Sequence, residues 1–397
     1  MTEEKKSDER TGVSRRAVLG WAGAGVGGLV VAGAAGATVR GAVNGAFSSG
    51  SGDPYELWKA YDGLMGTDRI IAAGILAANP HNTQPWRITA AADLIEIASD
   101  PSRMMPKNDA SGREHFAGLG SAAEQMAVVA ASLGRAPNVS VFPDGASGPA
   151  VRLELGSGTS DAALAAAVPL RHTDRSGYDG TELSAADLSS VAAMASLDGA
   201  SVTWITEPGA REALGKLYVE ATQAIVADTE ASEEAFSWFR NDRGDIDRYR
   251  DGLTLDCQGL DGFTLFLAKV LPAQSRTEGD QFWVKSTRDI HTKTAAAYGV
   301  VRVDDVADRS AQVTGGRLLA RLHLAATSAG LGFHHMNQIT ERIDRDAQTG
   351  AADVFSTRWG KAIGGPATTG LVSFRLGHST RKPGLSPRRA VDQVVAR

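Results

Sequence analysis

The 397-residue sequence contains a single cysteine, Cys257. One thiol excludes an intramolecular disulfide, a C-x-x-C redox pair and a metal site built from several cysteines. Cys257 lies close to Leu255 and Leu260, so we interpret it as a small buried hydrophobic residue, with a nucleophilic thiol as the alternative. The sequence also lacks G-x-S-x-G and H-E-x-x-H, which leaves a hydrolase without support.

The chain has little excess charge of either sign. It carries 41 Lys and Arg against 46 Asp and Glu, a formal net charge of −5, and the basic residues are scattered. We therefore expect no binding to nucleic acid or to anionic membranes through bulk electrostatics. The hydrophobic fraction of 43% is that of an ordinary globular protein, and the length allows one large or two medium domains.

Charge is absent from Trp21–Val39, a stretch rich in Ala, Gly and Val that follows Arg15-Arg16. This pattern resembles a twin-arginine export signal, with a small-residue cleavage site at 35–37 and an uncleaved anchor as the alternative. We expect residues 1–50 to be signal and linker, with the twin-arginine translocase as a partner. The protein would then reside at the cell envelope, on the periplasmic side or outside the cell. Because this route exports folded proteins, it also suggests a bound cofactor.

Two patterns that resemble ligand sites have simpler interpretations. Gly23, Gly25 and Gly28 spell G-x-G-x-x-G, but no predicted strand precedes them and they lie inside the export signal. His334 and His335 are adjacent, so they point apart on a helix or strand, and no acidic or histidine partner follows at metal-ligand spacing. We expect a substrate-pocket or structural role for this pair and no metal site.

The remaining chain predicts an α+β protein in two tandem halves, 51–158 and 159–397, with the seam in a Gly/Ser/Thr-rich stretch at 156–160. Phe236–Leu271 is rich in Trp, Phe, Arg and Asp and is interpreted as a lid or inserted helices. The pattern predicts helices over 54–61, 68–78, 113–133, 185–195, 210–227 and 316–329. It predicts strands over 86–89, 94–98, 139–142, 151–155, 202–205 and 371–376.

The densest chemical signal is the stretch 79–86, which reads N-P-H-N-T-Q-P-W. Pro80 and Pro85 stiffen the loop, while His81 and the amides of Asn82 and Gln84 offer donors and acceptors in a fixed array. Such an array suits the edge of a heteroaromatic ring. The alternative is a turn that only ends the preceding helix.

A second signal, Arg171-His172-Thr173-Asp174-Arg175, opens the second half. Two guanidiniums, a hydroxyl and an imidazole within five residues form a cradle for a phosphate monoester, since arginine binds phosphate oxygens bidentately. The alternative is a solvated loop in which the aspartate pairs with an arginine.

These motifs resemble those of the nitroreductase family. The stretch 79–86 is similar to its P-S-x-x-N-x-Q-P-W flavin loop, and 171–175 to its R-x-S-x-R phosphate segment. The resemblance also takes in Gly316 within the 315–332 helix region, which ends in A-G-L-G, and the Arg388-Arg389 tail. It covers most of residues 68–395 and implies a flavin-reductase fold that binds FMN.

In the family the phosphate segment precedes the flavin loop within one short chain, whereas here the order is reversed. The resemblance therefore implies an intramolecular pseudo-dimer with a single FMN, each half supplying one wall, as in the actinobacterial Acg-like branch. The phosphate would be held by Arg171, Thr173 and Arg388 or Arg389, and Arg175 would lie near the N1/C2 edge of the flavin ring.

The first half would line the flavin ring with Pro80, His81, Asn82 and Gln84, and His172 and Gly316 complete the expected cofactor site. His81 and Thr83 replace small residues of the family loop, and His172 and Thr173 replace Arg/Ser types, which leaves substrate preference open.

No side chain need act as acid or base, because hydride transfer is the cofactor's chemistry. The resemblance implies a two-electron oxidoreductase with a small-molecule donor and acceptor, as a monomer or loose homodimer. The alternatives are a protein that sequesters FMN behind the lid without turnover, and a scaffold whose motifs have decayed.

Overall fold

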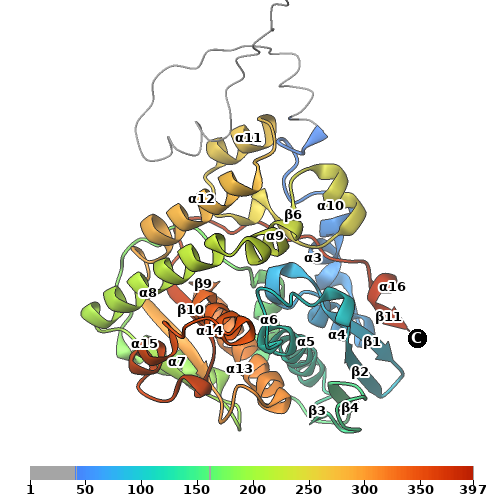
Figure 1. Cartoon of the computed structure of the whole chain (residues 1–397). Helices are drawn as coiled ribbons and strands as arrows, with labels where there is room; N and C mark the ends of the chain where they lie inside the picture. Colours follow the sequence, from blue (N-terminus) through green and yellow to red (C-terminus); the bar gives the residue numbers. More distant parts are fainter. Residues whose placement is uncertain (1–40, 42, 161, 397) are drawn as a thin grey trace, which may run out of the picture.

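The computed structural model describes residues 41, 43–160 and 162–396 (Figure 1). The expected export signal at 1–40 lies outside the described residues. Within them the chain is a mixed α+β protein, which confirms the predicted class. No helix in this described part is long and apolar enough to cross a membrane.

The first sheet is built from the front of the chain and its last residues. Its strand order is β11-β1-β2-β4-β3. The strands are β1 (Trp86–Ala90), β2 (Leu94–Ser99), β3 (Pro137–Val141), β4 (Val151–Leu155) and β11 (Val395–Ala396). β1 alternates buried Trp86 and Ile88 with exposed Arg87 and Thr89, the pattern of a strand with one buried face. β11 pairs parallel to β1, so the C-terminus returns to the first half, as Figure 1 shows.

The second sheet has the antiparallel order β5-β8-β10-β9. Its strands are β5 (Ser201–Ile205), β8 (Ala297–Arg302), β9 (Leu331–His335) and β10 (Gly370–His378), and a separate pair joins β6 (Phe239–Arg240) to β7 (Leu253–Thr254). β8 and β10 are buried along almost their whole length. A Cβ on Gly299 of β8 would lie 2.2 Å from the Phe374 ring, so this glycine makes room for the aromatic core.

Most of the helices cover these sheets or build the region above them. They are α3 (Glu56–Ala60), α4 (Gly66–Ile75), α5 (Arg113–Ser132), α6 (Ala162–Ala167), α7 (Ala185–Ala195), α8 (Pro208–Ala227), α9 (Thr229–Ser237), α10 (Arg243–Tyr249), α11 (Gly262–Val270), α12 (Arg276–Ser286), α13 (Arg309–Ser328), α14 (Gln338–Thr349), α15 (Ser356–Ile363) and α16 (Val391–Val394).

The centre of the molecule is the contact between α5 and α13, which lie side by side (Figure 1). α5 packs on the first sheet and α13 on the second, so the pair joins the two halves. A Cβ on Gly316 would lie 2.0 Å from the Ala117 carbonyl oxygen, and one on Gly120 would lie 2.0 Å from the Val313 carbonyl oxygen. The two helix backbones therefore touch directly, which only glycine allows. Buried Glu124 of α5 adds ion pairs to Arg317 and Arg321 of α13.

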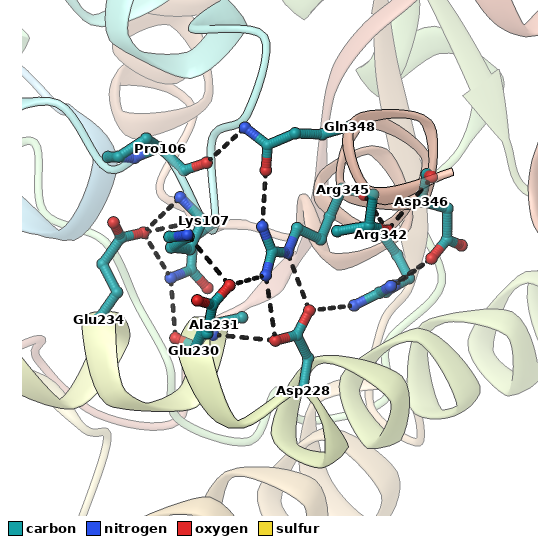
Figure 2. A network of polar contacts seen from close by, with 12 residues as sticks. Pro106, Lys107, Asp228, Glu230, Ala231, Glu234, Arg342, Arg345, Asp346 and Gln348 are labelled. Atoms are coloured by element: carbon teal, nitrogen blue, oxygen red, sulfur yellow. Dashed lines mark hydrogen bonds and ion pairs between the residues drawn. The ribbon is translucent and has the colours of Figure 1, made fainter. Parts of the chain in front are cut away.

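Helices α9 to α12 form the upper region of Figure 1. Figure 2 shows how α9 is fastened to α14 and to the loop before α5. Arg345 of α14 donates to Asp228 at 2.9 Å and to Glu230 at 2.6 Å, and Glu234 accepts the backbone N–H groups of Lys107 and Asn108. This network holds α9, which overlaps the stretch 236–271 only in its last two residues. The stretch 236–271 itself contains α10 and α11, and its role as a lid stays a prediction.

Most predicted elements are present, and two of them, β4 and α7, have the predicted bounds. The helix predicted over 316–329 is wrong at its start, because α13 begins at Arg309, where the Asp308 carboxylate caps the N–H groups of Ser310 and Ala311. β8 and β9 were not predicted, since buried strands containing glycine lack a period-2 pattern. One hydrophobic core includes residues of both expected halves, and the division at 158 stays a prediction.

The backbone contact predicts that Gly316→Ala will destabilise the protein. The added methyl group must push α5 and α13 apart, which we expect to cost about 1–3 kcal/mol or more. Gly262→Ala is the control, because nothing lies within 4 Å of its Cβ position, and it should leave stability unchanged or raise it by about 0.4–1 kcal/mol. Chemical denaturation measures both, and equal stabilities would contradict the tight crossing.

Candidate functional site

A large cavity is lined by residues from both sides of the predicted seam at 156–160, with residues of α9 and α12 in its wall. Its volume is about 1980 Å³ when the space open to solvent is included. Asn82 of the front loop and Arg171 of the second half both line it, so the two segments that carry the sequence signals face one space. The predicted site residues on its wall are Pro80, His81, Asn82, Arg171, His172, Thr173, Arg175 and Arg388.

The loop 79–86 has an unusual backbone. His81, Asn82 and Gln84 have φ angles of 45°, 55° and 51°, a left-handed conformation that costs a non-glycine residue roughly 1 kcal/mol or more. The loop is closed internally, because the Asn79 side-chain oxygen accepts the Gln84 backbone N–H at 2.7 Å. Such strain persists only where surrounding contacts fix the loop.

Those contacts come from the side-chain amides of the loop. Asn82 Nδ2 donates to the carbonyls of Gly252 at 3.1 Å and Pro387 at 2.9 Å, and its Oδ1 accepts from Arg388. Gln84 Nε2 donates to the Arg250 carbonyl at 2.9 Å, and its Oε1 accepts the Arg389 N–H at 2.8 Å. The two amides therefore bind the lid base and the C-terminal tail to the loop. This corrects the expectation that they are free to recognise a ring edge.

Arg171 and Arg388 converge on the C-terminal end of α4. Both donate to the Leu76 carbonyl, at 2.7 and 3.1 Å, where carbonyls left unpaired by the helix favour cations. Burial lowers the pKa of Arg171 to about 10 and, with the nearby Arg171 charge, lowers the pKa of Arg388 to about 9. Both therefore stay charged at neutral pH.

These guanidiniums have no carboxylate partner. Among the residues that the structure describes, no ion pair includes Arg171, Arg175 or Arg388. Arg388 Nε is buried without a hydrogen-bond partner, and Arg175 donates one bond, to the Cys257 carbonyl at 3.1 Å. Uncompensated buried charge is costly, so three cations beside one cavity indicate an anionic ligand.

The segment 171–175 runs beside strand β9. Thr173 pairs with Phe333, and the Asp174 N–H donates to the Phe333 carbonyl at 2.8 Å. This places His172 against the Trp58 ring, with centroids 4.5 Å apart. It also brings His334 and His335 to the cavity wall, so the predicted pocket position of that pair agrees with the structure.

The histidines of the cavity are neutral at neutral pH. Burial is the main cause, and the charge of nearby Arg175 contributes at His81, whose pKa falls to about 4. Burial and neighbouring arginines lower the pKa of His335 to about 3, and its Nε2 has no partner. Within the described residues no group of three His, Cys, Asp or Glu side chains has metal-binding geometry.

Three predicted site residues do not line the cavity. Gln84 lies behind the loop in the contacts given above, and Arg389 donates to the Gln393 carbonyl at 2.6 Å. Gly316 lies at the α5–α13 crossing, so its role is close packing. The structure thus corrects these three positions.

Several wall residues carried no recognised signal in the sequence. Glu114 of α5 and Gln338 and Glu341 of α14 reach the cavity from elements far apart in the chain. An apolar part of the wall is made of Phe236 and Phe239, from the expected lid, and of Phe282 and Trp283 on α12. The aromatic content of 236–271 indicated the first two in the sequence, and no signal indicated the α12 pair.

The loop contacts predict that Asn82→Ala will destabilise the protein by about 2–4 kcal/mol, through lost buried hydrogen bonds and the left-handed backbone. Asn82→Gly loses the same bonds but tolerates the φ angle, so it should be less harmful by about 1 kcal/mol. Asn138→Ala, which removes one exposed bond to Glu154, should change stability by less than about 0.5 kcal/mol. Denaturant titration compares the three, and an Asn82→Ala variant as stable as the control would refute the locked loop.

Comparison with known proteins gives partial matches. No family model matches the chain. A Mycobacterium tuberculosis H37Rv protein described as "Putative NAD(P)H nitroreductase" is 31% identical over 180 residues, 43% of this chain and 49% of that protein. The M. tuberculosis protein "Putative NAD(P)H nitroreductase acg" is 35% identical over 86 residues, 21% of this chain and 26% of that protein.

Solved structures give weaker similarity. The FMN-dependent nitroreductase NfnB of Mycobacterium smegmatis is 12% identical, covers 58% of this chain and 96% of that chain, and has a TM-score of 0.36. An FMN-bound nitroreductase of Desulfitobacterium hafniense is 15% identical, covers 58% and 95%, and has a TM-score of 0.34. The chain spans about half the length of the first curated relatives it matches, and over that stretch it is similar in sequence to proteins described as NAD(P)H nitroreductases.

Proposed function

We propose that the protein binds one FMN in this cavity and passes two electrons to a small acceptor, as a nitroreductase-like oxidoreductase. The observation that carries the proposal is a set of three guanidiniums on the cavity wall, those of buried Arg171 and Arg388 and of half-buried Arg175, none of which has a carboxylate partner among the described residues. A phosphate monoester matches them in charge and in hydrogen-bonding geometry. The partial similarity to the mycobacterial nitroreductases supports the same cofactor.

The residues present fit FMN. Arg388 offers its unpartnered Nε–H to the phosphate, and Thr173 offers a hydroxyl from the cavity wall. Arg175 has most of its donors unused and suits the anionic edge of the reduced ring. Arg171 already hydrogen-bonds to the Leu76 carbonyl and to His323, so it would contribute to phosphate binding mainly through its positive charge.

The flavin supplies the hydride chemistry, and the chain supplies position and exclusion of water. Pro80 and His81 of the strained front loop form one part of the wall, and Phe236, Phe239, Phe282 and Trp283 form an aromatic part of it. In this proposal the two halves act as an intramolecular pseudo-dimer around a single site, with an NAD(P)H-type donor and a nitroaromatic or quinone acceptor.

A second candidate function is FMN sequestration without turnover. The network of Figure 2 favours it, because Arg345 and Arg342 both bind Asp228 and hold α9 against α14. α9 ends at the cavity with Ala235 and Phe236, so a fixed α9 would restrict substrate entry on this side. The hydrogen bond from Arg345 is the main cause that lowers the pKa of Asp228 to about 2, so the fastening persists at any physiological pH.

We also propose twin-arginine export, on the pattern of Arg15-Arg16 and the uncharged stretch behind it. The translocase would then be a transient partner, and the folded protein would reside at the cell envelope, on the periplasmic side or outside the cell. As to assembly, we propose a monomer or a loose homodimer, because the paired halves supply both walls of the cavity.

Purification of the native protein tests the proposed function. We expect a yellow protein with flavin absorbance and about one FMN per chain, which consumes NAD(P)H when a quinone or nitroaromatic is added. A protein that binds FMN but does not consume NAD(P)H would support FMN sequestration over the oxidoreductase function. A colourless protein that does not take up added FMN would refute both functions and favour a scaffold with decayed motifs.

Arg171→Ala is expected to weaken FMN retention by about 1.5–3 kcal/mol, the scale of a lost charge-assisted bond. Arg171→Lys keeps the charge and should lose less. Arg69→Ala is the control, since Arg69 pairs with exposed Asp62 away from the cavity. FMN dissociation is measured by fluorescence, with unfolding followed in parallel to separate lost affinity from lost stability. Unchanged affinity in both Arg171 variants would refute the phosphate assignment.

A further inference from the structure

Two glutamates form a carboxyl pair on the wall of the cavity. Glu114 stands in the first turn of α5 and Glu341 in the first turn of α14, and both line the cavity. The two carboxyl groups lie close enough for their charges to interact. No ion pair within the described residues includes either glutamate. Two neighbouring carboxyl groups without a paired cation repel each other when both are ionised, so at least one of them is favoured to keep its proton.

The acidic residues around Glu114 and Glu341 further favour the protonated form of these two carboxyl groups. Asp109 lies beside both glutamates and accepts the backbone N–H of Glu114 at 3.1 Å. Asp344 follows on α14 and pairs with Arg113 of α5, so that cation is already neutralised. Asp280 of α12 lines the same cavity and contacts Arg276 at 3.6 Å. Burial, and then the charges of Asp109 and Asp344, raise the pKa of Glu341 to about 8. Burial, and then the charges of Glu341 and Asp109, raise the pKa of Glu114 well above its usual value.

A neighbouring amide gives an independent sign of a ligand. Gln338 is 5% exposed and lines the cavity from the same turn of α14 as Glu341. Its Oε1 is buried without a hydrogen-bond partner. Such an oxygen is costly unless a bound molecule brings an O–H or N–H group to it.

We infer that Glu341, which lies beside Glu114 on the cavity wall, is the proton donor for an electron acceptor of the quinone class bound in this cavity, and that Gln338 Oε1 accepts a hydrogen bond from the hydroxyl formed. The inference rests on the proposed function for the source of electrons. It adds an acid to the site, whereas the sequence alone led us to expect none.

The step balances as follows. One carbonyl group of the quinone receives a hydride, that is, two electrons and one proton, from the reduced flavin. The other carbonyl oxygen forms an O–H bond with the proton of Glu341. The O–H bond of Glu341 breaks and its electron pair stays on the carboxylate, which lies beside the protonated Glu114. The hydroquinone leaves, and a proton from water restores Glu341.

Glu341→Gln tests the step in the FMN-bound protein. We expect reoxidation of the reduced protein by benzoquinone to slow by about 100-fold in stopped-flow measurements, the usual scale of general acid catalysis. Reduction by NAD(P)H should be unchanged.

The reoxidation rate of the wild type should fall as the pH rises past about 8, the pKa of Glu341, and the variant should lose this dependence. Glu182→Gln is the control, since Glu182 is 81% exposed and away from the cavity. Equal reoxidation rates in wild type and Glu341→Gln would overturn the inference.

A second measurement needs no flavin. Because folding raises the pKa of Glu341, its contribution to stability is complete below the unfolded pKa near 4.5 and is lost as the pH rises to about 8. The thermal midpoint should therefore fall between pH 6.5 and 8, a range in which the buried histidines stay neutral. This fall should be smaller in Glu341→Gln and in Glu114→Gln, and unchanged in Glu182→Gln. An identical pH slope in all four proteins would show that the carboxyls hold no shared proton.

The two failures are distinguishable. Absence of bound FMN refutes the proposed function, while the thermal titration still tests the carboxyl pair. A flavoprotein that reduces quinones at an unchanged rate after Glu341→Gln keeps the proposed function and loses only the proton donor.

Discussion

The direct backbone contact between α5 and α13 is the constraint on which the rest of the structure depends. Gly120 and Gly316 remove the side chains that would separate the two helices, and the buried Glu124 carboxylate holds them together through Arg317 and Arg321. Each helix carries its own sheet. The cavity lies where the halves meet, with residues of both helices in its wall, so a change in this crossing moves both sides of the site.

Within the described residues, the arginines of the cavity wall form no ion pairs with its two protonated glutamates. Arginines without carboxylates stand at the end of α4, and glutamates without cations stand at the starts of α5 and α14. Burial makes each group costly, and the fold prevents the two sets from neutralising each other. An anionic phosphate group would neutralise the arginines, and an electron acceptor that takes up a proton would use the proton held by the glutamates. The proposed flavin site and the proposed proton donor thus answer the same electrostatic problem.

The strained front loop is held by distant parts of the chain. Asn82 reaches the lid base at Gly252 and the tail at Pro387 and Arg388, and the tail then adds β11 to the first sheet. The loop, the lid base and the C-terminal tail are therefore joined by direct hydrogen bonds. Any motion that opens the lid at its base is transmitted to the loop that forms the front wall.

The sequence by itself determined the α+β class, six of the fourteen α-helices in the described residues and the two segments that face the cavity, because caps, apolar periods and clusters such as 79–86 and 171–175 are local. It did not reveal β8 and β9, whose burial erases the period-2 pattern. Only the tertiary structure decided the use of each polar group: it assigned the amides of Asn82 and Gln84 to the scaffold and Gly316 to packing. It also brought Glu114 beside Glu341, since contacts between residues far apart in the chain depend on how helices cross, and no local pattern encodes that crossing.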